Sequence, residues 1–204
     1  FEVMEVYYKK DENRIYENVA LDGSLSDSFE GRLLNPGHGI EAMWFIMDLG
    51  VRLKNQKLIE KAAEISYSIL DYSWDTEHEG IFYFLDSKGL PPQQLEWDQK
   101  LWWVHVETLV CMAKAFALTG DERARHWFEK VHVYTWNHFK DLEYFEWFGY
   151  LNRKGDVLLP LKGGKWKGCF HVPRGLYQVY STLEKTQPLK KNPSESSLVQ
   201  LSVG

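Results

Sequence analysis

The feature that most constrains this chain is a repeated contrast between two kinds of helix. The segment from about 36 to 55 carries apolar residues around much of its circumference, whereas the segment from about 57 to 73 confines them to one face. The same pair recurs at about 98 to 119 and about 121 to 139. A helix that is apolar all round is buried, and a helix with one apolar face covers it. The pattern predicts inner helices covered by outer ones.

Stop and start signals separate these helices and extend the repeat. Asn35-Pro36 supplies a cap and a proline at the first helical position, and Gly120-Asp121 supplies a helix stop followed by a cap. A third buried-type helix is predicted over about 168 to 184, which gives a repeat of roughly 60 to 70 residues. Segments of strand character at 14–23, 81–92 and 147–156 are expected to connect the units.

This organisation predicts an all-α fold, an (α/α)6 barrel or toroid. Residues 1–185 supply about three helical hairpins with short β-like connections, and closure at six hairpins would need about twice this chain. We therefore expect an incomplete barrel. Because the chain opens at Phe1 within a segment of structured character, we interpret the sequence as a fragment. Residues 186–204 are rich in Pro, Ser and Lys without periodicity, and they are predicted to form a disordered tail.

Composition excludes several classes of partner. The 24 Lys and Arg residues against 29 Asp and Glu give no electrostatic reason to expect nucleic acid or an anionic membrane. No run approaches the roughly 20 apolar residues that cross a bilayer. Cys111 and Cys169 form no metal-binding spacing, which favours a reducing, intracellular compartment and predicts no metal site. Trp, Tyr and Phe make up 15% of the chain, and some of these rings are candidates to hold a sugar.

Two of the seven histidines stand out because each lies in the first turn of an inner helix. His38 has Glu41 three residues later on the same face, where we expect it to orient the imidazole. His171 has Arg174 in the same relation, where we expect its cation to hold a developing oxyanion. Glu107 lies deeper, on the middle inner helix. Hairpins stacked in register would bring these helix starts to one end of the barrel. We therefore expect the two imidazoles to meet across a shared cavity.

Such a group fits proton transfer next to a carbonyl. One imidazole, with an ordinary pKa near 6.5, takes the proton, the other returns it from the opposite face, and a cation holds the enediolate oxygen. This chemistry needs no cofactor. An aldose–ketose isomerase would use the same enediolate. A glycosidase would instead need two carboxyl groups about 5 to 10 Å apart, and Glu41, Glu107 and Glu146 keep that alternative open.

Four motifs carry a resemblance to a known family. PGHGIEAMWF, WDQKLWWVHVETL, WFGYLNRKGD and KGGKWKGCFHVPR, spread over residues 1–185, resemble the N-acylglucosamine 2-epimerases, called renin-binding proteins in vertebrates. The resemblance implies that this chain is the C-terminal part of a six-hairpin barrel. It implies a cytoplasmic homodimer that interconverts N-acetylglucosamine and N-acetylmannosamine without metal. By motif position, His171 is implied as an acid/base group and His38 as its opposite-face counterpart. The implied substrate-polarising or substrate-binding residues are Glu41, Glu107, Arg174, Lys100 and Trp103.

The resemblance also sets out what this sequence lacks. The N-terminal half, which is implied to add an Arg and aromatic walls to the pocket, is not in the sequence, so the activity of the 204 residues alone stays open. The alternative is an interaction module that binds renin without catalysis. Nucleotides such as ATP are implied as effectors, although no GxxxxGKS-type loop is present and the glycines of GGKWKG are too weak a pattern for a phosphate site.

Overall fold

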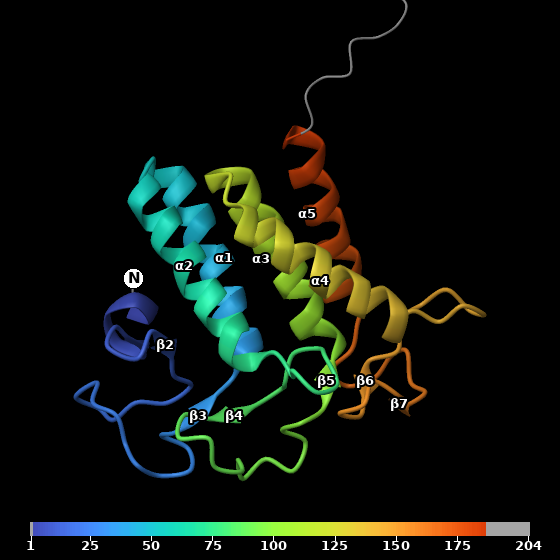
Figure 1. Cartoon of the computed structure of the whole chain (residues 1–204), viewed down its shortest axis with the longest axis horizontal. Helices are drawn as coiled ribbons and strands as arrows, with labels where there is room; N and C mark the ends of the chain where they lie inside the picture. The colour runs from blue at the N-terminus through green and yellow to red at the C-terminus, as the bar shows by residue number, and fades with distance from the viewer. Residues whose placement is uncertain (1, 187–204) are drawn as a thin grey trace, which may run out of the picture.

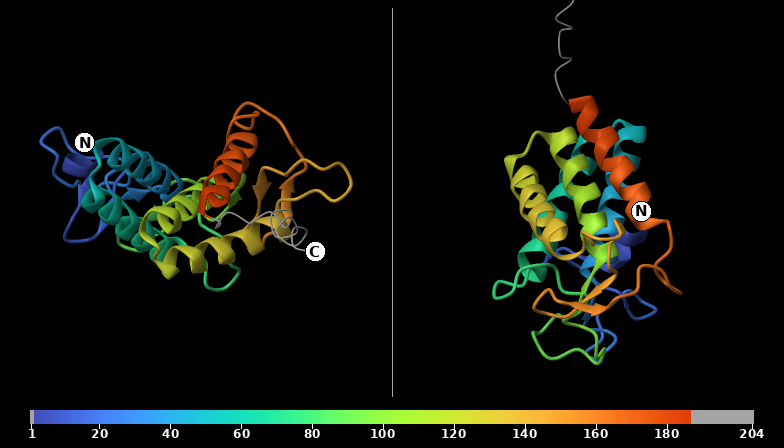
Figure 2. Two further views of the ribbon diagram at one scale, coloured as in Figure 1. Left: turned by 90° about the horizontal axis from the view of Figure 1, so that it is seen from above. Right: turned by 90° about the vertical axis from the view of Figure 1, so that its right-hand side faces the viewer.

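A computed structural model describes residues 2–186 of the chain, and these residues form two layers of helices (Figure 1). The inner helices are α1 (Pro36–Leu53), α3 (Trp102–Thr119) and α5 (His171–Thr186), and the outer helices are α2 (Gln56–Ser73) and α4 (Glu122–His138). In order, α1, α3 and α5 lie side by side, with α2 on α1 and α4 on α3. Seen from above, the helices follow an arc (Figure 2). This confirms the predicted incomplete barrel, with two hairpins and a single further inner helix in the described part.

The predicted helix boundaries are largely confirmed. The side chain of Asn35 accepts a hydrogen bond from the backbone of His38 and starts α1, while Asp121 caps α4 in the same way. Gly120 ends α3 with a φ of 68°, in the left-handed region that glycine adopts without a Cβ clash. Every residue of α3 from Trp102 to Ala113 is buried, as its all-round apolar pattern predicts. It begins four residues later than predicted because Lys100–Leu101 form a strand.

The prediction for the third inner helix is wrong in one respect. It was expected to be buried, but Gly175 is the one residue of α5 that is buried. One face of α5 packs on α3, whereas Tyr177 and Tyr180 are exposed, because within residues 2–186 no outer helix covers α5. At the contact, a Cβ on Gly175 would lie 2.1 Å from Val106, so the two helix backbones approach closely only because this residue is glycine.

Short strands connect the helices, and they are shorter than predicted. They pair as β1 (Tyr8–Lys9) with β2 (Arg14–Ile15), β3 (Leu33–Leu34) with β4 (Leu85–Asp86), and β5 (Lys100–Leu101) with β6 (Tyr150–Leu151), which also pairs with β7 (Val157–Leu159). A π-helical turn, η1 (Val3–Tyr7), precedes them. The sheets β3–β4 and β5–β6–β7 lie at the end where the inner helices begin (Figure 1). They therefore supply side chains around the helix N-termini.

Two further predictions concern the chain as a whole. Of the tail predicted over 186–204, Thr186 belongs to α5 and the other residues lie outside the described part. Between residues 2 and 186, no helix combines the length and the apolar sequence needed to cross a membrane.

Candidate active site

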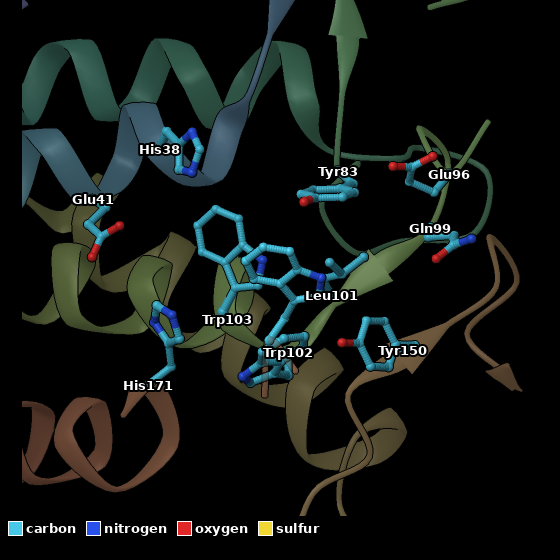
Figure 3. Close-up of a pocket in the computed structure, with 11 residues that line it drawn as sticks. His38, Glu41, Tyr83, Glu96, Gln99, Leu101, Trp102, Trp103, Tyr150 and His171 are labelled. Carbon is cyan, nitrogen blue, oxygen red and sulfur yellow. The ribbon is translucent and has the colours of Figure 1, made fainter. Parts of the chain in front are cut away.

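A cavity of about 490 Å³ opens at the N-terminal ends of the inner helices (Figure 3). Its volume is within the range of small-molecule sites. All three inner helices and the connecting segments contribute to its lining: His38, Glu41, Trp102, Trp103, His171, Tyr83, Glu96, Gln99, Leu101, Tyr150 and Trp166. The structure therefore confirms that His38 and His171 line one cavity. Residues from three separate repeats build this cavity.

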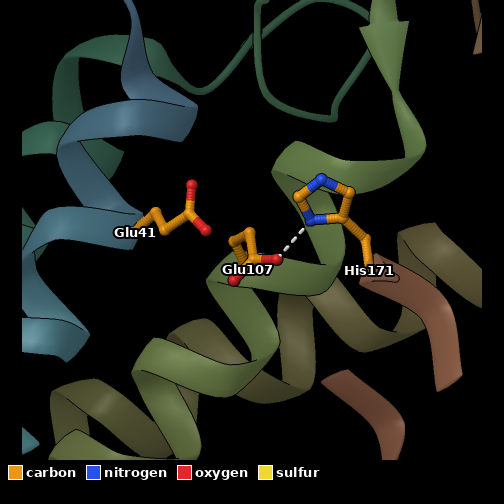
Figure 4. Close-up of side chains that lie close together, drawn as sticks. All are labelled: Glu41, Glu107 and His171. Carbon is orange, nitrogen blue, oxygen red and sulfur yellow. Dashed lines mark hydrogen bonds and ion pairs between the residues drawn. The ribbon is translucent and has the colours of Figure 1, made fainter. Parts of the chain in front are cut away.

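On the α5 side, His171 is held by a buried carboxylate. Its Nδ1 lies 2.5 Å from Oε1 of Glu107, which is fully buried on α3 (Figure 4). The same Glu107 oxygen pairs with the guanidinium of Arg174, and the other oxygen accepts a hydrogen bond from the indole of Trp44 at 2.9 Å. An ionised carboxylate only accepts, so Nδ1 of His171 carries the hydrogen and Nε2 is left free. Glu107 thus fixes both the tautomer and the ring orientation.

On the α1 side, His38 is held by a different carboxylate from the one predicted. Glu41 was expected to orient it from one turn along the helix, but Nδ1 of His38 lies 3.0 Å from both oxygens of Glu17. Glu17 follows β2 in the connection that precedes α1. Its hydrogen bond raises the pKa of His38, its charge and that of Glu41 add to the rise, and burial opposes it. Spacing along a helix could not reveal this contact, because Glu17 lies 21 residues before His38 and outside α1.

Glu41 lies between the two histidines but bonds to neither. Its side chain points toward Glu107 and His171 (Figure 4), and one ligand atom from each of the three lies within 4.8 Å of the others. Burial and the charge of Glu107 raise the pKa of Glu41, while His171, Arg174 and His38 lower it. The three side chains have donor atoms that suit a cation, yet Arg174 already supplies a positive charge to Glu107. A site without metal stays our prediction.

Trp103 lines the cavity between the two histidines, and its contact with substrate stays a prediction. Its ring centroid lies 5.2 Å from that of His38 and 5.7 Å from that of His171. A Cβ on Gly37 would come within 2.4 Å of this indole, so the glycine leaves the room that the ring occupies. An apolar ring at this place suits the apolar face of a sugar.

Lys100 was predicted to bind substrate, and the structure places it elsewhere. Its side chain is completely buried, and its Nζ lies 3.1 Å from Oδ2 of Asp75 and 3.8 Å from the ring centre of Phe82. Burial lowers the pKa of Lys100 to about 8, against the opposing effect of Asp75. Arg153 pairs with the same carboxylate at 3.0 Å. Because no surface of Lys100 faces the cavity, we assign it to the anchoring of β5 rather than to the site.

The third carboxylate that kept a glycosidase open is also outside this cavity. Glu146 pairs with Lys167 at 3.2 Å and lines a second cavity beside the start of α5. Glu107 is held by three partners. Glu41 is therefore the one carboxyl group of these three that lines the cavity without a hydrogen-bond partner among the described residues. Glu96 also lines the cavity, so carboxyl groups as well as imidazoles face it.

The family model described as N-acylglucosamine 2-epimerase (GlcNAc 2-epimerase) matches residues 2–173. This chain belongs to that family. The resemblance drawn from the four motifs is therefore confirmed. The helices and the cavity at their N-terminal ends are those of a member of the N-acylglucosamine 2-epimerase family.

Curated relatives in the N-acylglucosamine 2-epimerase family support the same assignment. The N-acylglucosamine 2-epimerase of Mus musculus is 42% identical over 194 residues, which cover 94% of this chain and 46% of the relative. That of Bos taurus is 45% identical over 164 residues, or 79% of this chain and 39% of the relative. The chain thus spans about half the length of the curated relatives it matches.

A solved structure supports the fold. The crystal structure of a D-mannose isomerase superposes with a TM-score of 0.72 at 20% sequence identity, over 84% of this chain and 45% of that one. At this identity the likeness concerns the fold alone. It agrees with the arc of inner and outer helices as part of an (α/α) barrel.

Proposed function

We propose that the protein to which this chain belongs epimerises carbon 2 of N-acyl-D-glucosamine to give N-acyl-D-mannosamine. One observation carries the proposal: imidazoles from α1 and α5 line one cavity, and each has a carboxylate on its Nδ1. This leaves one Nε2 on each side of the cavity for proton transfer. The name shared by relatives 40 to 45% identical supplies the sugar.

The reaction exchanges one proton between two faces of the same carbon. In the open-chain sugar, one neutral imidazole takes the hydrogen from carbon 2, and the bonding electrons form a double bond to carbon 1 while the carbonyl oxygen becomes an enolate. The other histidine, as imidazolium, then protonates the opposite face, and the carbonyl re-forms. Carbon 2 carries an amide nitrogen here, so the intermediate is an enolate; an enediolate would arise from a 2-hydroxy sugar. One histidine has gained a proton and the other has lost one.

The remaining polar groups have distinct parts in this scheme. Arg174 was expected to stabilise the oxyanion directly, but its guanidinium is bound to Glu107 and Gln178. We assign Arg174 to balancing the charge of Glu107. Glu41 has a raised pKa and no hydrogen-bond partner among the described residues. It is therefore a group available to contact a sugar hydroxyl or, when protonated, to donate to the enolate oxygen.

The proposal is tested by following hydrogen exchange at carbon 2. In a form of the protein that turns over N-acetylglucosamine in deuterium oxide, proton NMR should show deuterium entering carbon 2. His38→Ala and His171→Ala should each slow this exchange by about 100-fold to 10,000-fold. His126→Ala, at an exposed position on α4, is the matched control and should keep the rate. Normal exchange in both active-site variants would sink the assignment.

Other properties implied by the resemblance stay predictions. These are the homodimer, the cytoplasmic location, the response to ATP and the association with renin. The renin-binding alternative separates cleanly from catalysis. An association that survives replacement of both histidines, together with no exchange in any form of the protein, would favour an interaction module.

A further inference from the structure

Glu17 is a carboxylate that no motif singled out, and its position is well fixed. Both of its oxygens face Nδ1 of His38 at 3.0 Å. Its backbone N–H donates to the carbonyl of Leu33 at 3.3 Å, and that of the preceding Tyr16 donates to the carbonyl of Tyr7 at 3.1 Å. Leu33 and Tyr16 are buried. The backbone around Glu17 is thus tied to the fold, and the carboxylate is presented to one imidazole.

On the α1 side of the cavity, the charged side chains close to His38 are all negative. Glu17 approaches from the connection before α1, Glu41 lies one turn along α1, and the uncharged ring of Trp103 approaches from α3. Across the cavity, His171 and Arg174 are paired with Glu107. Glu17 forms no ion pair with a Lys or Arg anywhere in residues 2–186. His38 is therefore the partner of its ion pair, and the uncharged hydroxyl of Tyr83 is a further group near its charge.

The two histidines differ in what protonation does to their surroundings. A proton on His38 makes the pair with Glu17 neutral overall. A proton on His171 meets a carboxylate, Glu107, whose charge Arg174 already balances, so Glu41 is the remaining negative charge near that ring. Glu41 also lies near His38, so more negative charge is left unbalanced around His38 than around His171, and a proton on His38 is favoured. The raised pKa of His38 agrees with this.

We propose that Glu17 is a positioning residue of the epimerase reaction: it fixes the ring of His38 and places on that histidine the single proton that the two imidazoles share before each turnover. The inference rests on the proposed function for its catalytic part. His38 then donates its proton from Nε2 while His171 removes the carbon 2 proton, and His38 is left neutral on Glu17. Transfer of the proton back from His171, through solvent or by the reverse reaction, restores the starting state.

The pairing is tested without any turnover by histidine NMR on the 204-residue chain. The ring signal of His38, assigned by its loss in His38→Ala, should titrate about one pH unit lower in Glu17→Gln than in the unaltered chain. Glu17→Asp keeps the charge and should restore most of the shift. Glu60→Gln, at an exposed position on α2, is the matched control and should change nothing. An unchanged His38 titration in Glu17→Gln would overturn the proposal.

Kinetics separates a positioning role from a structural one. In a form that turns over sugar, Glu17→Gln should move the alkaline limb of the kcat profile about one pH unit lower, with little change in KM and recovery in Glu17→Asp. A shifted His38 titration with an unmoved alkaline limb would overturn the catalytic part and leave the epimerase assignment standing. Failure of the unaltered protein to exchange carbon 2 would instead overturn the proposed function, and the catalytic role of Glu17 with it.

Discussion

The two sides of the cavity hold a histidine in different ways. We call Glu107 with His171 the buried pair and Glu17 with His38 the open pair. In the buried pair the carboxylate is fully buried and has three partners, whereas in the open pair the Glu17 and His38 side chains are 25% and 55% exposed. The buried pair spans two packed helices, and the open pair joins a helix to a connecting segment. The same contact at Nδ1 is thus set in two environments.

Because of this difference, we expect Glu107 to act on the stability of the fold and Glu17 to act mainly on the protonation of its histidine. A buried carboxylate with three partners is part of the packing between α1, α3 and α5, so removing its charge disturbs the fold as well as the histidine. A partly exposed carboxylate with one partner adds little to stability but still acts on the protonation of its neighbour. Stability and histidine protonation, measured separately in matched variants, therefore test whether the two carboxylates act differently.

The largest effect on stability is expected at the buried pair. Glu107→Gln keeps the shape but leaves Arg174 without its ionic partner in a largely dry position, and this should lower the free energy of unfolding by about 3 kcal/mol. Urea unfolding followed by circular dichroism measures the change. The exchange rate at carbon 2 should fall as well, because His171 loses the group that fixes its tautomer.

Glu60→Gln on the exposed face of α2 is the control for this substitution, and it should lie within about 0.5 kcal/mol of the unaltered chain. If Glu107→Gln unfolds at the same urea concentration as that control, Glu107 has no special part in the packing, and the distinction between the two pairs fails.

Local patterns account for what the sequence could predict. Helix periodicity and caps place α1 to α4, and they put His38 and His171 in the first turn of inner helices, because each signal lies within a few residues of its effect. The meeting of the two rings then follows from stacking the repeats in register. The overestimated burial of α5 has a different origin. The apolar residues of α5 can be recognised in the sequence. Whether an outer helix covers them depends on other segments, which the sequence of α5 does not specify.

The side chains that were misplaced depend on contacts between distant segments. Lys100 is removed from the cavity by Asp75, which is 25 residues earlier and at the end of another hairpin. Glu17 reaches His38 through an irregular connection, where neither a period of 3.6 nor a period of 2 applies. An acidic residue in the segment before an inner helix is the signal that could have been followed, although it specifies no partner.

A smaller effect is expected where α5 meets α3. A Cβ at position 175 would lie 2.1 Å from Val106, so Gly175→Ala should push α5 outward and draw His171 away from Glu107. We expect a loss of about 1 to 3 kcal/mol, measured by urea unfolding, and slower exchange at carbon 2. Gly168→Ala is the matched control, because a Cβ there meets nothing within 4 Å. Equal stability of the two variants would mean that the buried pair does not depend on this close approach.

The smallest effect on stability is expected at the open pair, and its size depends on pH. The pKa of His38 is raised in the folded chain, so its pairing with Glu17 stabilises the fold at pH values below about 6.5, and the gain is lost as pH rises through the folded value. Glu17→Gln should therefore cost less than about 1 kcal/mol at pH 5.5 and close to nothing at pH 8.5. Urea unfolding of both proteins at the two pH values measures this difference. A loss that is equal at both would show that Glu17 acts by packing, as Glu107 does, and the two sides of the cavity would then differ only in degree.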